Sequence, residues 1–307
     1  MGKAKKQVQE KEACFCAPAP ASKPDWLKIK LPSNGNFFRV AELMRKRGLH
    51  TICQSARCPN MTECWTAKTA TFLILGDTCT RDCGFCAVKK GSPASPEPDE
   101  PGRVAEAALA LGLEYVVITS VTRDDLDDGG AAVFARTVEA VKKRIPGVEV
   151  EVLIPDFGGR TADLETVLGA GPEILNHNLE TTESLYPRIN RPAANYERSL
   201  GVLRHAKKMG ARTKSGLMVG LGERKEDIIQ TLSDLRRAGC DLLTIGQYLQ
   251  PTPAQAPVQK YYAPLEFEQL RNVALDFGFV NAVAGPLVRS SFQAGRLSRS
   301  LDRRREA

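Results

Sequence analysis

The chain has 307 residues, of which 42% are hydrophobic and 26% are charged, a balance typical of a globular protein. Its apolar runs are only a few residues long, so the composition excludes a membrane-spanning protein, and it also excludes a disordered chain. The formal net charge of +7 is compatible with an acidic partner but is too small to indicate a nucleic-acid binder. We therefore expect neither a nucleic acid nor a membrane as partner.

The nine cysteines are an odd number, so they cannot all pair with one another, and they are too few for a disulfide scaffold. The first twelve residues are rich in Lys and Gln and lack the apolar core of a signal peptide. We therefore expect a cytoplasmic protein with reduced thiols. In that compartment, clustered cysteines indicate metal binding or catalysis.

The first part of the chain precedes any regular alternation of elements. Residues 1–24 combine Lys, Gln and Glu with an Ala-Pro repeat, which predicts a disordered leader. Residues 25–68 form a cysteine-bearing N-terminal segment. Within it, the hydrophobic periodicity predicts a short helix, Phe37–Arg47, that Gly48 ends.

From residue 69 onward, strands and helices are predicted to alternate. Runs of β-branched and apolar residues predict six strands: Thr69–Leu75, Tyr115–Val121, Val148–Ile154, Glu173–Leu179, Thr213–Val219 and Leu242–Tyr248. Helical periodicity predicts a helix after each of them: Val104–Leu111, Ala131–Arg144, Ala162–Leu168, Tyr196–Met209, Lys225–Ala238 and Leu265–Phe277. This alternation predicts a parallel sheet with right-handed crossovers. It leaves open a doubly wound sheet and a partial (β/α) barrel.

Residues 281–307 form a C-terminal extension that ends in a basic tail. From Arg296 onward the tail is predicted as a solvated, frayed helix. Five arginines make it basic: Arg296, Arg299, Arg303, Arg304 and Arg305.

Three cysteines with the spacing Cys79-x3-Cys83-x2-Cys86 directly follow the first predicted strand. The carboxyl ends of strands are where α/β folds place their sites, and a tight turn can bring three thiols to one metal centre. Three ligands on a four-iron cube leave one iron open, as a catalytic metal site requires. A zinc knuckle is the alternative, but it would need a fourth ligand.

A second group, Cys53-x4-Cys58-x5-Cys64, lies upstream of the first strand. Three cysteines cannot all pair as disulfides, so we predict a second iron–sulfur cluster whose fourth ligand comes from elsewhere. The remaining cysteines show no such pattern. Cys240 is predicted to be a small buried hydrophobe, and Cys14 and Cys16 lie in the leader.

The loop Cys79–Cys86, with Phe85 just before its last cysteine, resembles the signature of the radical S-adenosylmethionine (SAM) enzymes. The resemblance implies a partial (β/α)6 TIM-type barrel, which we assign to residues 69–280. It also implies a 4Fe–4S cluster on these three cysteines, with its open iron chelated by SAM. The resemblance therefore favours the partial barrel over the doubly wound sheet.

The two cysteine groups together resemble one family, lipoyl synthase. Similar motifs are found in Leu49–Trp65, Thr69–Cys79 and Arg289–Phe292, and the similarity extends from Asp25 to Gly295. Two departures from the family pattern stand out. Phe292 replaces the usual tyrosine and keeps its ring, and Gln54-Ser55 replaces acidic residues, for which we have no physical account.

The resemblance implies that the upstream cysteines and one serine hold an auxiliary 4Fe–4S cluster. The serine is Ser290 or Ser291, and we favour Ser291 as the ligand. An alkoxide is a harder ligand than a thiolate and is held less durably in a sulfur-rich cluster. Such a ligand suits a cluster that gives up its sulfide.

Residues at the ends of the later strands are candidates for contact with SAM. Asn178 and Glu180 lie on one face of the fourth strand and are expected at the ribose. The alternative is that they cap loop amides. Arg191 is expected at the methionine carboxylate. Phe85 and the glycines Gly216 and Gly220 are also assigned to cofactor binding; a glycine pattern alone is weak evidence, because a tight turn would select it.

Two polar groups have structural interpretations instead. The acidic run from Asp124 to Asp128 is predicted to cap a helix, with a second possible role at the amino group of SAM. The three histidines are too scattered for a metal site, and His177 is predicted to be packed or hydrogen-bonded.

The resemblance implies an enzyme of lipoate biosynthesis, a radical SAM sulfurtransferase. A reduced first cluster would cleave SAM to a 5′-deoxyadenosyl radical, which removes hydrogen from a protein-bound N6-octanoyl-lysine. Two sulfur atoms from the auxiliary cluster would then enter at C6 and C8. The implied partners are octanoylated carrier domains, of the dehydrogenase-complex E2 or glycine-cleavage H protein type, and an electron donor such as ferredoxin or flavodoxin.

Two alternatives remain at this point. One is another radical SAM sulfur-inserting enzyme, resembling biotin synthase or a methylthiotransferase. The other is a non-catalytic iron–sulfur electron-transfer protein.

Overall fold

The computed structural model describes residues 22–29, 32, 35–192, 194–299 and 301. Most of the predicted leader, with Cys14 and Cys16, and the tail residues Arg303, Arg304 and Arg305 therefore lie outside the described residues. None of the described helices is long and apolar enough to cross a membrane.

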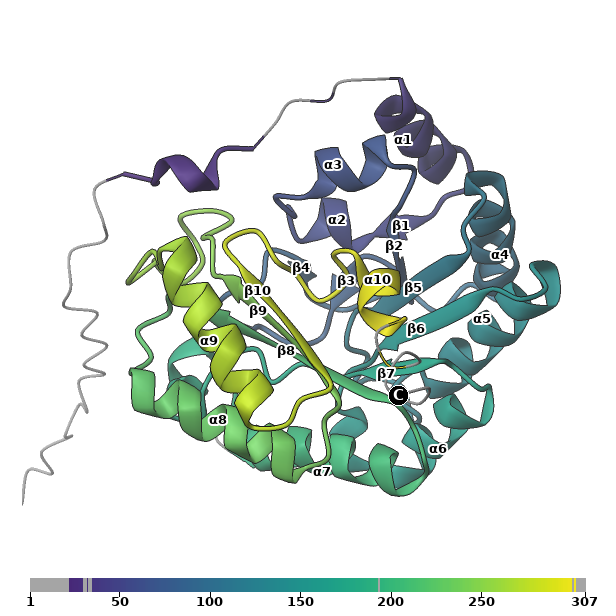
Figure 1. Cartoon of the computed structure of the whole chain (residues 1–307). Helices are drawn as coiled ribbons and strands as arrows, with labels where there is room; N and C mark the ends of the chain where they lie inside the picture. Colours follow the sequence, from purple (N-terminus) through teal and green to yellow (C-terminus); the bar gives the residue numbers. More distant parts are fainter. Residues whose placement is uncertain (1–21, 30–31, 33–34, 193, 300, 302–307) are drawn as a thin grey trace, which may run out of the picture.

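A curved sheet forms the centre of the described structure (Figure 1). Its strands follow one another in chain order: β1 (His50–Thr51), β2 (Thr71–Ile74), β5 (Tyr115–Ser120), β6 (Glu149–Leu153), β7 (Ile174–Asn176), β8 (Thr213–Val219), β9 (Leu242–Gln247) and β10 (Asn281–Gly285). Neighbours from β2 to β10 are parallel, whereas β1 is antiparallel to β2.

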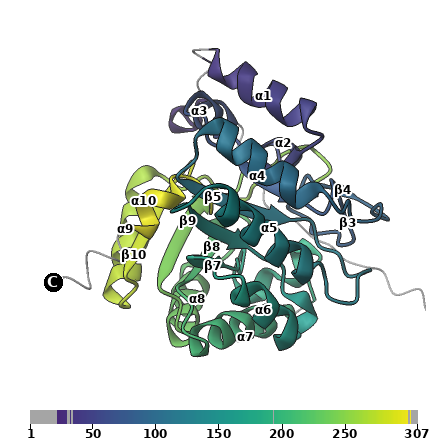
Figure 2. The same cartoon turned by 90° about the vertical axis from the view of Figure 1, so that its right-hand side faces the viewer.

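Helices cover the outer face of this sheet (Figures 1 and 2). They are α4 (Glu100–Leu111), α5 (Ala131–Arg144), α6 (Thr161–Gly169), α7 (Ala194–Lys208), α8 (Lys225–Arg237) and α9 (Pro264–Asp276). A doubly wound sheet would reverse its strand order, but here the order is sequential. The fold is therefore the expected partial barrel, with β1 and β10 at its two edges.

Alternating residues of the strands point in opposite directions. Val116, Ile118 and Val150 are fully buried against the helix side of the sheet. The residues between them face the barrel interior, where Lys214 Nζ lies 2.8 Å from Glu151 Oε1. The interior of the barrel thus carries a buried ion pair, while the apolar core lies between sheet and helices.

The six predicted strands and six predicted helices are all present, and α5 has the predicted bounds. Most other bounds differ from the predicted ones by a few residues, and two of these differences have local reasons. Helix α4 begins at Glu100 rather than Val104, because Pro101 fits the first turn of a helix. Strand β7 ends at Asn176, and beyond it only an isolated bridge from Glu180 to Leu217 continues the pairing.

Several short elements were not predicted. In the N-terminal segment, helix α1 (Asn36–Lys46) was expected, and it is followed by β1, α2 (Ile52–Ser55) and α3 (Met61–Thr66). The first cysteine loop contains the two-stranded pair β3 (Thr78–Cys79) and β4 (Lys89–Lys90).

The C-terminal extension adds β10 and helix α10 (Ala294–Ser298), which contacts both β5 and β10. Leu297 packs with Ile174, Leu242 and Leu301. For the described part of the tail, the prediction of a solvated, frayed helix is therefore wrong, because an apolar contact holds α10 against the barrel.

Candidate active site

The first cysteine loop follows β2, at the carboxyl end of the barrel strands. Cys79, Cys83 and Cys86 are free and partly exposed there. Burial, together with the nearby Cys83 and Cys79 thiols, raises the pKa of the Cys86 thiol to about 12. The three thiols are thus close enough for their charges to interact.

Backbone hydrogen bonds hold this loop against the segments that follow β7 and β9. Gly84 donates its N–H to the carbonyl of Ile189 at 2.7 Å and accepts a hydrogen bond from Ala256 N at 2.8 Å. A Cβ at Gly84 would lie 3.4 Å from the Ile189 backbone, at van der Waals contact distance. Next to it, Phe85 packs against the apolar cluster of Leu185, Ile189, Leu221, Tyr248 and Val258.

The second cysteine group lines a cavity of about 750 Å³. Cys53 lies in α2, Cys58 follows it, and Cys64 lies in α3. Burial raises the pKa of Cys64 to about 12, and the Cys53 and Cys58 thiols add to the shift. These three thiols therefore also form one group, separate from the loop after β2.

The two serines of the C-terminal motif differ in position. Ser291 lines the same cavity as Cys53, Cys58 and Cys64. Ser290 instead donates a hydrogen bond from its Oγ to Asn178 Oδ1 at 3.0 Å. Of the two candidates, Ser291 is the one that lies at the wall of the cavity.

The chemistry of both donor sets fits an iron–sulfur cluster. The thiolate is the ligating form of cysteine, and the charge of a metal centre stabilises a thiolate that burial alone would disfavour. Among the described residues, no group of three or more His, Cys, Asp or Glu is arranged to hold a metal ion. A cube binds each cysteine through a different iron, so its ligands lie further apart than those of one ion.

Asn178, Glu180 and Arg191 come together close to the first cysteine loop. Asn178 Nδ2 donates to Glu180 Oε1 at 3.2 Å. Burial raises the pKa of Glu180, and the charge of Arg191 opposes that shift. The Arg191 guanidinium lies 4.8 Å from the ring centre of Tyr186, and it also favours the charged form of Cys83.

The two candidate glycines lie at different places. A Cβ at Gly216 would lie within 2.9 Å of the side-chain oxygens of Ser290, Asn178 and Thr244. Gly220 has a φ of +108° and packs against Gln247 and the carbonyl of Lys260. Protein atoms thus fill the space beside both glycines, and their contact with a cofactor stays a prediction.

The structural interpretations of the remaining polar residues are confirmed in part. Asp128 accepts hydrogen bonds from the N–H groups of Gly130 and Ala132 at the start of α5, so it acts as a cap. Asp124 instead pairs with Arg81. His177 is buried and hydrogen-bonded, and Cys240 is fully buried.

One site residue, Arg289, had no sequence signal beyond its place in the motif. It lines the cavity of the second cysteine group. Burial lowers its pKa, and Cys58 and Glu180 oppose the shift. Arg289 therefore lies close to both candidate sites.

A three-cysteine loop after the first parallel strand of a partial barrel defines the class of radical SAM enzymes. The family model "Radical SAM superfamily" matches residues 73–235. Among solved structures, methylornithine synthase is similar with a TM-score of 0.52 and 16% identity, covering 84% of this chain and 83% of that one. The hydrogenase maturase HydG from Carboxydothermus hydrogenoformans has a TM-score of 0.53 and 12% identity, covering 78% of this chain and 63% of that one. At these identities the likeness concerns the fold alone.

Curated relatives define the family within this class. The lipoyl synthase of Symbiobacterium thermophilum is 53% identical over 278 residues, covering 90% of this chain and 87% of the relative. That of Halalkalibacterium halodurans is 54% identical over 288 residues, covering 93% and 95%. The chain belongs to the lipoyl synthase family. It is a radical SAM enzyme that inserts sulfur, and its cofactors are two 4Fe–4S clusters and SAM.

Proposed function

We propose that the chain divides sulfur insertion between its two groups of cysteines. Cys79, Cys83 and Cys86 hold the cluster that binds SAM. Cys53, Cys58, Cys64 and Ser291 hold the cluster that donates two sulfur atoms to C6 and C8 of an octanoyl-lysine. The observation that carries this proposal is the pair of separate three-thiol groups, of which only the upstream one shares a cavity with Ser291.

The proposal assigns the parts of the chain accordingly. Residues 25–68 form the auxiliary-cluster segment, residues 69–280 the barrel, and residues 281–307 the extension that supplies the serine. When bound, SAM and the first cluster supply a carbon-centred radical able to remove hydrogen from an unactivated carbon. The second cluster is consumed as the sulfur source and is in that sense a substrate.

The residues around the first loop orient SAM. Asn178 and Glu180 hydrogen-bond its ribose, and Arg191 pairs with its carboxylate. The burial of Asn178 and Arg191 supports these roles, because a charged hydrogen bond is strongest where water is excluded. Phe85, Gly216 and Gly220 are assigned to the apolar and backbone surroundings of the cofactor.

Iron and sulfide analysis of anaerobically reconstituted variants tests whether each group of cysteines holds its own cluster. The unmodified chain is expected to bind about eight irons, and replacement of either cysteine triad by alanine about four. The variant lacking Cys53, Cys58 and Cys64 should still cleave SAM but form no lipoyl group. Full lipoyl formation by that variant would contradict the proposal.

The two serines provide a matched pair for the same analysis. Ser291→Ala is expected to weaken retention of the second cluster, because it removes the oxygen at the cavity wall. Ser290→Ala removes the hydrogen bond to Asn178 but leaves that wall intact, so its iron content should stay unchanged. The opposite pattern would make Ser290 the ligand.

We further propose that an octanoylated carrier domain docks at the mouth of the cavity. Leu113, Val117 and Phe292 give the cavity an apolar wall suited to an acyl chain. Three exposed cations also border it and have no carboxylate partner among the described residues: Lys68, Arg296 and Arg299. An acidic lipoyl-type domain would complement this rim. A ferredoxin or flavodoxin is the proposed electron donor.

Charge reversal at the cavity mouth tests the docking proposal. A variant carrying Lys68→Glu, Arg296→Glu and Arg299→Glu should bind the octanoylated carrier more weakly and with a smaller salt dependence. The control reverses three exposed lysines on the outer helices, Lys143, Lys208 and Lys225. Titration at several salt concentrations measures both variants. Equal weakening in the two would show that only net charge matters and would refute this docking site.

A further inference from the structure

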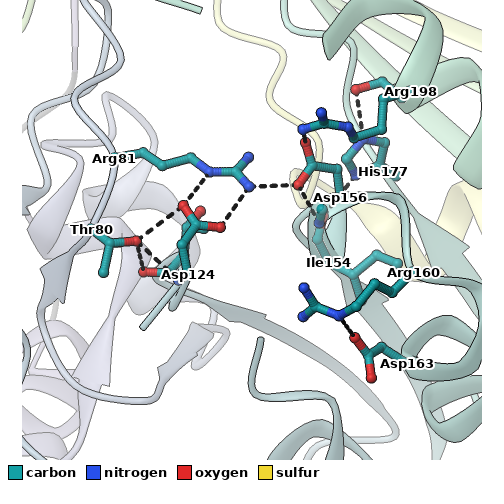
Figure 3. A network of polar contacts seen from close by, with 12 residues as sticks. Thr80, Arg81, Asp124, Ile154, Asp156, Arg160, Asp163, His177 and Arg198 are labelled. Atoms are coloured by element: carbon teal, nitrogen blue, oxygen red, sulfur yellow. Dashed lines mark hydrogen bonds and ion pairs between the residues drawn. The ribbon is translucent and has the colours of Figure 1, made fainter. Parts of the chain in front are cut away.

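Arg81 lies inside the first cysteine loop, between Cys79 and Cys83, and its side chain reaches the ends of two neighbouring strands. Its Nε and Nη2 donate to the two carboxylate oxygens of Asp124, at 2.7 and 2.8 Å (Figure 3). Nη2 also donates to Asp156 Oδ1 at 2.6 Å. One guanidinium therefore links the loop to the segments that follow β5 and β6.

Asp156 is the buried member of this network. Its side chain is fully buried, and its Oδ1 also accepts a hydrogen bond from Gly158 N at 3.1 Å. Its second oxygen has no hydrogen-bond partner among the described residues, and Arg198 Nη1 lies 3.6 Å away from it. A buried carboxylate is costly unless it is paired, so the ion pair with Arg81 is strongly favoured.

Backbone contacts reinforce the same side of the loop. Thr80 donates from its N–H and from its Oγ to the carbonyl of Thr122, at 3.1 and 3.0 Å. The N–H of Asp124 donates back to Thr80 Oγ at 3.1 Å. The loop is thus closely joined to the segment after β5, and Arg81 extends this attachment to β6.

We propose that Arg81 is a positioning residue for the first cluster. By holding the segment from Cys79 to Cys83 against the ends of β5 and β6, it keeps the three thiols in the arrangement that a cube requires. Only a guanidinium can serve both carboxylates in this way, because its donors form a rigid planar fork. The inference rests on the proposed assignment of Cys79, Cys83 and Cys86 as ligands.

Thiol alkylation of the full-length, metal-free chain tests this role without any loaded cofactor. In Arg81→Lys, Cys79, Cys83 and Cys86 should react with iodoacetamide about tenfold faster, because the ammonium cannot satisfy both carboxylates and the loop opens more often. Cys53, Cys58 and Cys64 serve as the internal reference and should keep their rates. Arg160→Lys is the matched control, since it alters a neighbouring exposed pair with Asp163 (Figure 3).

A second readout uses the reconstituted enzyme. Arg81→Lys should lose iron preferentially from the first cluster, and the remaining first cluster should show an altered electron paramagnetic resonance signal on addition of SAM. Asp156→Asn should change both readouts in the same direction. A purely structural role would instead accelerate alkylation of all six cysteines equally, and that result would overturn the proposal, as would unchanged rates.

Failure of this inference is distinguishable from failure of the proposed function. The alkylation pattern depends on the mobility of the loop and on the pKa values of its thiols, where Arg81→Lys keeps the positive charge, and it does not require bound iron. The ligand assignment is tested separately by the iron content of the chain without Cys79, Cys83 and Cys86. Full iron content in that variant would remove the assignment, whatever the alkylation rates of Arg81→Lys are.

Discussion

At the scale of single residues, the imidazole of His177 is held between two partners that define its tautomer. Nδ1 lies 2.9 Å from the carbonyl oxygen of Ile154, which can only accept, so Nδ1 carries the hydrogen. Nε2 then accepts from Ser199 Oγ at 2.9 Å. Burial lowers the pKa of His177 to about 4, although the Ile154 carbonyl and Asp156 oppose this shift.

This lowered pKa predicts a loss of stability in mild acid. Between its unfolded value near 6.5 and its folded value near 4, His177 binds a proton more readily in the unfolded chain. Its contribution is therefore fully present above about pH 6.5 and is lost as the pH falls. We expect a loss of about 2 kcal/mol between pH 7 and pH 5 from this residue.

Urea unfolding of the metal-free chain at the two pH values measures this loss. His177→Gln keeps hydrogen-bonding groups but does not titrate, so its free energy of unfolding should depend less on pH. An equally steep dependence in the variant would show that other groups cause the loss.

At the scale of elements, long periodic segments were predictable and short ones were not. Helix α5 and strand β8 have the predicted bounds because their patterns are long and unambiguous. Strand β10 has the small-residue sequence of Asn281–Gly285, which carries no β-branched run, and β1 is only a pair of residues. Both depend on pairing with a neighbouring strand, which local sequence does not encode.

The candidate site also had one part that the sequence predicted and another that depended on the fold. Cysteine spacing alone predicted two groups of thiols, because their ligands lie close together in sequence. The family resemblance already favoured Ser291, but only the fold showed that Ser291 lines the cavity while Ser290 bonds to Asn178. The pair of Arg81 and Asp156 joins residues 75 positions apart and had no local signal.

The close packing of β9 against the loop that follows β10 gives a prediction at the scale of elements. A Cβ at Gly246 would collide with the carbonyl oxygen of Val288 and lie 3.1 Å from Arg289 Nη1. Gly246→Ala should therefore lower the free energy of unfolding by about 1–3 kcal/mol and shift the loop that carries Ser291.

Thermal unfolding and iron analysis measure the effect of this substitution. Gly201→Ala in α7 is the control, because nothing lies within 4 Å of its Cβ position. That variant should be unchanged or slightly stabilised, since alanine favours a helix. An unchanged melting temperature and full iron content in Gly246→Ala would refute the idea that close packing fixes the loop.

At the scale of the whole molecule, residues from both ends of the described chain line the cavity of the second cysteine group. The N-terminal segment supplies Cys53, Cys58 and Cys64, and the C-terminal extension supplies Ser291. Asn60 joins the two by donating from Nδ2 to the carbonyl of Leu287 at 2.5 Å. The cavity is therefore closed only when both extensions are folded against the barrel.

The origin of the inserted sulfur tests the central claim most directly. The enzyme is reconstituted with ³⁴S sulfide and incubated anaerobically with reductant, SAM and an octanoylated carrier domain, whose intact mass is then measured. The account predicts a carrier that gains two ³⁴S atoms from the unmodified enzyme and none from the variant lacking Cys53, Cys58 and Cys64. A lipoylated carrier without heavy sulfur, or with heavy sulfur from that variant, would contradict it.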